Sequence, residues 1–275
     1  MLFSILIANY NNGSFFKECY DSIINQTFTD FEVIIVDDAS SDDSIAIISK
    51  LIANDSRFRL LINEKNNGAG FTKKRGVDNA SGVLCGYLDP DDALTTDALE
   101  VMVLAHQKNP SASLIYSTNY NCDANLKIIS TKNDRIQQPK GVSVIEQTCV
   151  SHFATFKREN YLKSVQVNPN YKRAVDVDLY CVLEEVGDIV FLNKPLYYYR
   201  IHENGISRNT NTHKAEYWEL IIKHDHAQRK GLNGEDAFQE RINYYKSDVS
   251  SYSNFTLIKI AASRLIGRFL KKKIR

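Results

Sequence analysis

The tetrapeptide Asp89-Pro90-Asp91-Asp92 is the densest group of side chains able to do chemistry in this sequence. It directly follows an apolar run from Val83 to Leu88. Carboxylates at the end of a strand form a hard oxygen site that suits Mg²⁺ or Mn²⁺, and such an ion can bridge two phosphates. A solvated acidic turn in which Asp92 caps the next helix fits the same residues. Taken alone, the motif leaves both interpretations open.

A second acidic pair, Asp37-Asp38, ends the apolar run 31–36. Its carboxylates can accept hydrogen bonds from a base N–H or from ribose hydroxyls. A polar loop with a helix cap is the alternative interpretation.

A glycine-containing loop, Asn67-Gly68-Ala69-Gly70, precedes three consecutive basic residues, Lys73, Lys74 and Arg75. The loop is a candidate phosphate cradle in which one basic side chain meets a diphosphate, and an exposed helix face is the alternative. Lys73 stands where a dinucleotide fingerprint has its third glycine, and the loop does not follow the first strand. A nicotinamide-dependent dehydrogenase is therefore excluded.

Strand-like runs alternate with helix-like segments in the first half of the chain, which predicts βαβ units and a mostly parallel sheet. In such sheets ligands bind beyond the carboxyl ends of the strands, where Asn9-Tyr10-Asn11 and both acidic motifs lie. In the second half we predict a hairpin or loop, strands and further helices. The predicted strands are 2–8, 31–36, 57–62, 83–88, 114–117, 189–192 and 196–200; the helices are 16–24, one capped by Ser41 or Asp42 that includes residues 45–52, 70–80, 95–109, 176–185, 217–230 and 235–248; and the hairpin or loop is 119–140.

Composition narrows the class of protein. The 275 residues include 34 basic and 33 acidic ones, a formal net charge of +1 that gives no argument for nucleic acid as a partner. The five cysteines are far apart in the sequence, which favours a reducing compartment. The start of the sequence lacks the pattern of a signal peptide, and no apolar stretch has the length of a membrane span. We expect a cytoplasmic protein.

The last 21 residues, 255–275, are basic and contain no acidic residue. Apolar residues follow helical spacing within them, which predicts a basic amphipathic helix. Such a helix can lie on an anionic membrane surface, at the inner face of the membrane, or pack on its own domain. The apolar positions are Ile258, Ala261, Ala262, Leu265 and Phe269.

Seven motifs in a fixed order resemble those of the family 2 glycosyltransferases, which have a GT-A fold. Each motif is weak alone, but their order and spacing make the set specific, and together they span residues 2–207. The motifs are Ala8-Asn9-Tyr10-Asn11, 22–28, Val36-Asp37-Asp38-Ala39-Ser40, Asn67-Gly68-Ala69-Gly70, Leu88-Asp89-Pro90-Asp91-Asp92, 175–180 and 196–202.

The resemblance implies a role for each matching position. Asp176 stands where the family places its catalytic base, and Asp91 where it binds the metal ion, Mn²⁺ or Mg²⁺. Arg200 and His202 match a late motif that closes over the donor diphosphate, and we also assign His202 to the metal. The remaining donor-site residues are Ala8 and Tyr10 beside the base, Asp38 on the base or ribose, Asp89 on the ribose or metal, and Gly68 and Arg75 in the glycine loop and basic run.

Two departures from the family pattern concern the base and the basic run. Val175 replaces the glutamate that often precedes the base, which leaves Asp178 as the alternative helper carboxylate. Asp178 is a weak candidate for a second nucleophile, because residues two apart on a helix do not share a face. Arg75 is followed by Gly76, where the family often has Arg-Asn. The Gln-x-x-Arg-Trp motif of processive synthases is absent, which favours transfer of one sugar per encounter.

The resemblance implies an inverting, metal-dependent hexosyl- or N-acetylhexosaminyl-transferase. Its donor would be a nucleotide-diphosphate sugar, by default a UDP-sugar, and its acceptor a hydroxyl of a glycan or lipid-linked molecule in bacterial surface polysaccharide synthesis. A sugar nucleotidyltransferase is one alternative, but residues 9–13 lack the expected glycine- and arginine-rich loop. An inactive nucleotide-sugar-binding module is the other, and retention of Asp38, Asp91 and Asp176 argues against it.

We expect two parts in the chain. Residues 1–207 would form the GT-A domain, with a nucleotide-sugar-binding half at 1–118 and an acceptor-side half at 119–207. Residues 208–275 would form a C-terminal helical extension.

Overall fold

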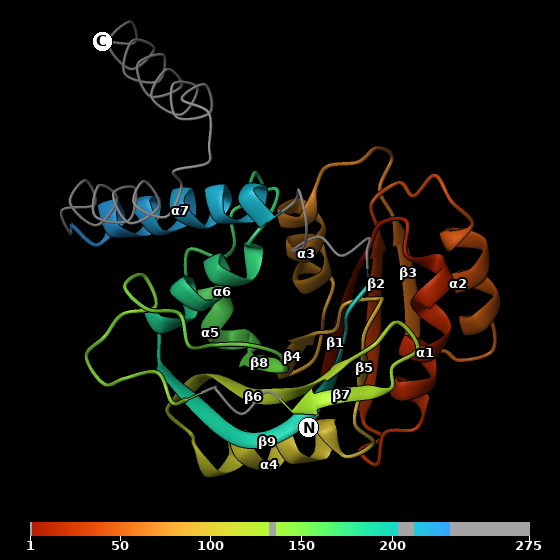
Figure 1. The fold of residues 1–275 in the computed structure, drawn as a ribbon, viewed down its shortest axis with the longest axis horizontal. Coiled ribbons are helices and arrows are strands. Elements are labelled where there is room, and N and C mark those ends of the chain that lie inside the picture. The colour runs from red at the N-terminus through yellow and green to blue at the C-terminus, as the bar shows by residue number, and fades with distance from the viewer. Residues whose placement is uncertain (1, 132–135, 203–211, 232–275) are drawn as a thin grey trace, which may run out of the picture.

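The computed structural model describes residues 2–131, 136–202 and 212–231. A nine-stranded sheet runs through the molecule in the order β3-β2-β1-β4-β8-β6-β9-β5, and β7 pairs with β6 (Figure 1). The strands are β1 (Phe3–Asn9), β2 (Phe31–Asp37), β3 (Phe58–Ile62), β4 (Leu84–Tyr87), β5 (Ala93–Leu94), β6 (Ala112–Cys122), β7 (Ile128–Thr131), β8 (Ala154–Lys157) and β9 (Asp188–Arg200).

Helices cover both faces of the sheet, so the fold has three layers (Figure 1). Alternate residues of β1 supply both cores, because successive side chains of a strand point to opposite faces. Phe3, Ile5 and Ile7 pack with α1, α2 and α4 in one core, whereas Leu6 packs with α3, α5, α6 and α7 in the other. The helices are α1 (Phe16–Ile24), α2 (Ser44–Ile52), α3 (Ala69–Asp78), α4 (Ala98–Lys108), α5 (Arg158–Lys163), α6 (Val175–Glu184) and α7 (Thr212–Arg229), and a short 3₁₀ helix, η1 (Gly13–Phe15), precedes α1.

The sheet is parallel in its first half and mixed in its second. Strands β3, β2, β1 and β4 are parallel neighbours, as the alternating pattern predicts. Beyond β4 the strand β8 is antiparallel to both β4 and β6, while β9 runs parallel to β6. The predicted α/β class is confirmed, but "mostly parallel" holds only for the half of the sheet formed by β3, β2, β1 and β4.

Two predicted elements differ in extent from those observed. The separate strands 189–192 and 196–200 are one continuous strand, β9, whose pairing with β6 contains register shifts near Thr118. The polar segment after β6 is partly a hairpin, because β7 pairs antiparallel with β6 from Tyr120 to Cys122. Polar residues in the middle of both segments weaken the strand signal in the sequence without breaking the strands.

The helix α7 packs on the domain, although the sequence places it in a C-terminal extension. Ile222 and Ala227 are buried, and Trp218 packs against Tyr171 with ring centroids 6.0 Å apart. The boundary at residue 207 stays a prediction, as does the division at 118. The predicted helix 235–248 and the basic tail lie outside the described residues. Within the described ranges, no helix is both long and apolar enough to cross a bilayer.

Candidate active site

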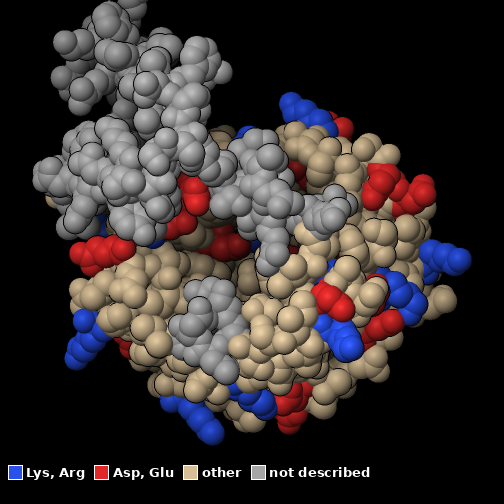
Figure 2. Space-filling model, in the orientation of Figure 1, with Lys and Arg blue, Asp and Glu red and all other residues tan. Residues whose placement is uncertain are grey.

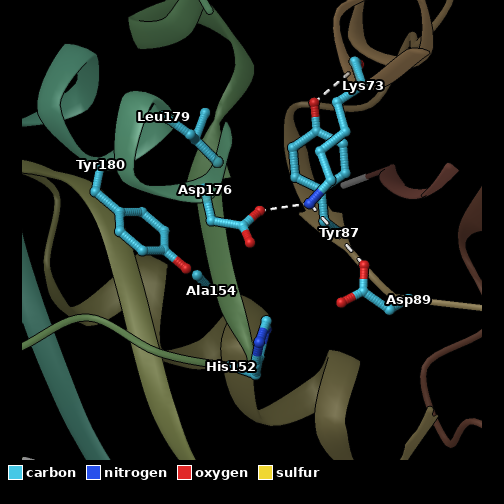
Figure 3. Close-up of a pocket in the computed structure, with 8 residues that line it drawn as sticks. All are labelled: Lys73, Tyr87, Asp89, His152, Ala154, Asp176, Leu179 and Tyr180. Atoms are coloured by element: carbon cyan, nitrogen blue, oxygen red, sulfur yellow. Dashed lines mark hydrogen bonds and ion pairs between the residues drawn. The ribbon is translucent and has the colours of Figure 1, made fainter. Parts of the chain in front are cut away.

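A pocket opens beyond the carboxyl end of β4, where the parallel half of the sheet meets β8 (Figure 3). Its empty volume is about 270 Å³, which includes the part of the pocket that is open to solvent. Two helices contribute charged side chains to it: Lys73 lies on α3, and Asp176 lies in the first turn of α6. The lining residues are Lys73, Tyr87, Asp89, His152, Ala154, Asp176, Leu179 and Tyr180.

An ion pair between Lys73 and Asp176 lies at the centre of this pocket (Figure 3). The ammonium also lies 3.9 Å from Asp89 Oδ1 and 4.9 Å from the ring centroid of Tyr87. The hydroxyl of Tyr87 donates a hydrogen bond to the carbonyl of Lys73 at 2.9 Å, which ties the helix turn to β4. One cation therefore bridges two carboxylates from distant parts of the sequence.

The charges in the pocket shift the pKa values of all three groups. Burial is the largest single effect on Asp176 and favours its neutral form, but the charge and hydrogen bond of Lys73, together with His152, outweigh it and lower the pKa. For Asp89 burial prevails and raises the pKa, although Lys73 opposes it. Burial alone would lower the pKa of Lys73, yet Asp176 and Asp89 together raise it. Asp176 is thus held as a carboxylate, the form that a general base requires.

Asp91 and His202, the two predicted metal ligands, contact each other directly. His202 Nε2 lies 2.8 Å from Asp91 Oδ2, and the imidazole packs on Phe15 with ring centroids 4.6 Å apart. Carboxylates are ligands of Mg²⁺ and Mn²⁺, and imidazole is a ligand of transition metals, so the pair fits Mn²⁺ better than Mg²⁺. Among the described residues no three ligand side chains group together, so phosphate oxygens and water would complete the coordination.

Asp92 holds the acidic turn against β9. Its carboxylate accepts hydrogen bonds from the Tyr197 hydroxyl and from the backbone N–H of Arg200, both at 2.7 Å. Asp92 is 2 % exposed, and burial together with the neighbouring Asp91 raises its pKa well above the usual range. The residue is part of a structural clamp that aims Asp91 at His202, and it does not cap the next helix through its side chain.

Arg200 lies beneath this turn. Its Nε donates to the carbonyl of Asp91 and its Nη1 to the carbonyl of Ala124, both at 2.5 Å, while the guanidinium stacks over Phe15. The side chain is 1 % exposed. Arg200 therefore ties the acidic turn to the β6–β7 hairpin, and its predicted contact with the diphosphate stays a prediction.

The predicted base- and ribose-binding residues lie at the carboxyl ends of β1 and β2. Ala8 is half-buried and Tyr10 is 46 % exposed, so both border solvent at the sheet edge. Asp38 is 3 % exposed, and its carboxylate accepts hydrogen bonds from Asn63 Nδ2 and from the backbone N–H groups of Asn67 and Gly68, at 2.7–2.9 Å. In this structure Asp38 shapes the glycine loop from within, and its contact with the donor stays a prediction.

The glycine loop is packed under the segment that precedes α6. The N–H of Gly70 donates to the carbonyl of Tyr171 at 2.9 Å, and a Cβ on Gly70 would lie 2.5 Å from that oxygen. Gly68 has φ +91° and lies against the side chain of Lys172. Because the N–H donors of Asn67, Gly68 and Gly70 are already used inside the protein, close backbone approach explains the glycines better than a phosphate cradle does.

Of the three basic residues after this loop, Lys73 reaches the pocket and Arg75 does not. Arg75 Nη1 donates to the carbonyl of Ile62 and to the side chain of Asn63, at the end of β3. Lys74 pairs with Asp78 and donates to Gln166. The assignment of Arg75 to the donor stays a prediction, and the contacts favour Lys73.

Asp178, the alternative helper carboxylate, faces away from the pocket. It is 2 % exposed and accepts hydrogen bonds from His226 Nε2 at 2.5 Å and from the backbone N–H of Asn168 at 2.7 Å. The prediction that Asp178 and Asp176 point in different directions agrees with these contacts. Asp178 joins α6 to α7 and has no access to a substrate.

Sequence reasoning assigned no role to His152, and it left Lys73 only as one of three basic residues that could meet a diphosphate. Helical periodicity could have narrowed the choice among the three basic residues of α3, since only one of three consecutive residues can face the sheet. His152 stands in an irregular segment between predicted elements, with no spacing to distinguish it. Its position follows from the pairing of β8 between β4 and β6.

The geometry agrees with the comparison to known protein families. The model described as "Glycosyl transferase family 2" matches residues 4–163, more than half of the chain. The chain therefore belongs to glycosyl transferase family 2.

Two similar relatives illustrate the range of the family. Over 221 residues the chain is 33% identical to a chondroitin synthase of Escherichia coli, covering 80% of this chain and 32% of that protein. It is also 26% identical, over an alignment of 221 residues, to glycosyltransferase GlyG of Streptococcus pneumoniae, covering 75% of this chain and 73% of GlyG. The chain spans about a third or less of the length of the synthases that it matches.

Solved structures share the fold. The S. aureus TarS 1–349 structure in complex with UDP-GlcNAc has a TM-score of 0.70 at 19% identity, covering 90% of this chain and 73% of that one. A mannosyltransferase from Pyrobaculum calidifontis in complex with GDP-Man and Mn²⁺ has a TM-score of 0.60 at 12% identity, covering 96% and 79%. The predicted GT-A fold is thereby confirmed.

Proposed function

We propose that this protein transfers one sugar from a nucleotide-diphosphate sugar to an acceptor hydroxyl, with inversion at the anomeric carbon. The observation that carries the proposal is the pocket in which Asp176, Lys73 and Asp89 face one another, beside the Asp91–His202 pair. The family, whose members include chondroitin and hyaluronan synthases, supports transfer to a glycan. The TarS complex with UDP-GlcNAc supports UDP as the nucleotide.

The reaction needs one base and one leaving-group site, and the pocket offers both. The acceptor oxygen forms a bond to the anomeric carbon while the bond from that carbon to the diphosphate breaks. The acceptor proton passes to Asp176, and the nucleoside diphosphate leaves with the bonding electrons. A single carboxylate reaches the pocket from α6, because Asp178 is turned away, so one displacement that inverts the centre is favoured over two.

Lys73 connects the two halves of this reaction. Its ammonium pairs with Asp176 and lies 3.9 Å from Asp89. A bound diphosphate would compete with Asp176 for this cation, which would free the carboxylate for the acceptor and neutralise charge on the leaving group. A divalent ion held by Asp91 and His202 would add to that neutralisation.

The acceptor and the location of the enzyme belong to the same proposal. We infer a glycan or lipid-linked acceptor at the cytoplasmic face of a membrane, with the basic residues 255–275 as the contact to anionic lipid. Flotation with vesicles of anionic lipid tests that contact. Equal recovery of the full chain and of a chain ending at residue 231 would contradict it.

A panel of nucleotide sugars, assayed for nucleotide release with and without an acceptor, tests the activity. We expect release from one nucleotide class, dependent on Mn²⁺ and abolished by a chelator. Asp91→Ala should lose metal-dependent donor binding and keep its melting temperature, because this carboxylate borders solvent. Full activity in the chelator would contradict the metal assignment, and transfer of the nucleotidyl group would favour the alternative of a nucleotidyltransferase.

Asp176→Asn tests the base. Turnover should fall by on the order of 10²–10⁴, since asparagine keeps the shape and cannot take the proton. Donor affinity should not fall, because the metal ligands are intact and Lys73 no longer pairs with a carboxylate at this position. Asp178→Ala is the matched control two residues along the same helix. It should lower stability by about 1–3 kcal/mol, because the buried donors His226 Nε2 and the Asn168 N–H lose their acceptor. Turnover of Asp176→Asn within a few-fold of the parent would reject the assignment.

A further inference from the structure

His152 occupies the pocket without a role in the reaction described above. It precedes β8, and its imidazole stacks on two side chains of β9 (Figure 3 shows it facing the pocket). The centroid of the imidazole ring lies 5.0 Å from that of the Tyr197 ring, with an interplanar angle of 19°. It lies 5.8 Å from that of the Tyr199 ring, with an interplanar angle of 11°. Tyr197 and Tyr199 are two apart on the strand and so present the same face. Two parallel rings therefore hold the imidazole plane.

The polar atoms of this imidazole remain available for a ligand. Among the described residues none is hydrogen-bonded to it, whereas His106, His202 and His226 each have a side-chain partner at 2.5–3.0 Å. Its nitrogens are not among the buried atoms without a partner, so they are open to the pocket. An oriented, unused hydrogen-bonding group in a pocket is what a polar ligand would need for recognition.

The position of His152 selects the part of the substrate that it can reach. It lines the pocket together with Asp89 and Asp176, and its imidazole faces the space between these two carboxylates (Figure 3). The diphosphate belongs on the side of Asp91 and His202, and the attacking hydroxyl belongs at Asp176. What lies between them during transfer is the ring of the donated sugar.

We propose that His152 forms a hydrogen bond with a ring hydroxyl of the transferred sugar and thereby helps to select the donor. The assignment rests on the proposed function, because it requires a nucleotide sugar in this pocket. An imidazole is suited to this contact, since a hydroxyl both donates and accepts. A site that hydrogen-bonds a substrate hydroxyl discriminates against donors that lack it or carry it in another orientation.

The experiment compares two affinities in each variant. One is for the nucleotide sugar that the panel selects, and the other is for its free nucleoside diphosphate. In His152→Ala the affinity for the nucleoside diphosphate should stay within about twofold of the parent. The ratio of nucleotide-sugar affinity to diphosphate affinity, which measures what the sugar contributes, should fall about tenfold through the loss of one hydrogen bond. Preference in kcat/KM over the epimeric or deoxy donor should fall by a similar factor. His152→Gln, which keeps a polar group, should retain part of both.

His224→Ala on α7 is the matched histidine control and should change neither quantity. Unchanged donor preference in both His152 variants would overturn the proposal. Loss of diphosphate and nucleotide-sugar binding in equal measure would overturn it too, in favour of a structural role through Tyr197 and Tyr199. If the alanine variant does not fold, the glutamine variant decides by the same two affinities. A parent protein that releases nucleotide from no donor would contradict the proposed function itself, an outcome distinct from these.

Discussion

At the scale of single residues, the direction of a side chain decides its role. Lys73, Lys74 and Arg75 are chemically similar neighbours, but successive residues of a helix are about 100° apart around its axis. Lys73 consequently faces Asp176, Lys74 faces Asp78, and Arg75 faces the end of β3. Sequence reasoning favoured Arg75 as the residue that meets the donor. The contacts favour Lys73, the only one of the three that shares a pocket with two carboxylates.

We predict that Lys73→Gln moves the acid limb of the pH–rate profile upward. Lys73 lowers the pKa of Asp176, so its removal lets burial raise that pKa, and the base becomes protonated at a higher pH. The limb should move to higher pH, the direction expected when a nearby opposite charge is lost. The measurement is kcat/KM against pH.

Lys74→Gln is the control for this prediction, because it removes the same charge one residue along the helix. Its partners are Asp78 and Gln166, and it does not line the pocket. The acid limb of this variant should stay in place. Identical profiles for Lys73→Gln and the parent would show that Lys73 does not control the base.

At the scale of elements, the segment before α6 couples the glycine loop to α7. Tyr171 accepts a hydrogen bond from the N–H of Gly70, and its hydroxyl donates to Asp225 Oδ2 on α7 at 2.7 Å. Asn168 at the start of this segment is fixed to Asp178, which is in turn bonded to His226 on α7. Asp176, the proposed base, and the loop around Asp38 are thus held by one packed unit.

Two glycines of α3 should respond oppositely to the same substitution. In Gly70→Ala the added Cβ would lie 2.5 Å from the carbonyl of Tyr171 and 2.6 Å from that of Asn168, both backbone atoms that cannot move alone. We expect a loss of about 1–3 kcal/mol of stability, as for other overpacked sites, and weaker donor binding. In Gly76→Ala the Cβ would meet its nearest atoms at 3.9 Å, and alanine should stabilise the helix by about 0.5–1 kcal/mol.

Denaturant unfolding of the two variants measures this difference, and donor titration measures its effect on the site. Equal stability of Gly70→Ala and Gly76→Ala would show that the segment from Asn168 to Tyr171 yields without cost. The close packing would then have no bearing on the donor site.

At the scale of the whole molecule, helix α7, which lies beyond the predicted boundary at residue 207, packs on the rest of the fold. Helix α7 buries Ile222 and Ala227 and pairs Arg229 with Glu185 and Lys230 with Glu184. Basic and acidic side chains are interspersed over the face in Figure 2, with no patch of a single sign among the described residues there. The strong charge bias of the chain lies in residues 255–275, outside the described part.

Two truncations locate the end of the folded unit. A chain ending at residue 231 should keep the melting temperature of the parent, because every described contact of α7 is retained. A chain ending at residue 211 loses α7, which exposes the apolar surface that Ile222 and Ala227 cover and removes the hydrogen bond between His226 and Asp178, so it should melt at a lower temperature or fail to fold. Thermal unfolding and soluble yield measure both. Equal stability of the two truncations would show that the folded unit ends before α7, as the predicted boundary at residue 207 implies.

The sequence by itself determined the features that depend on near neighbours in the chain. Alternating apolar runs predicted β1 to β4 and their helices within a few residues, and the polar clusters marked the strand ends at which the pocket opens. The order of the short motifs was enough to identify the family, and the start of α6 at Val175 placed Asp176 in a first helical turn. These properties are local, because periodicity and turn chemistry act over a few residues.

Only the tertiary structure decided which side chains meet. Lys73 and Asp176 are 103 positions apart, and Asp91 and His202 are 111 apart, so no local pattern links them. The mixed pairing of β8, β6 and β9 brings His152 into the pocket, and the segment at 168–172 explains the glycines that resembled a phosphate cradle. The physical reason is that such contacts depend on helix phase and strand pairing, which are settled when distant segments bury their apolar faces together.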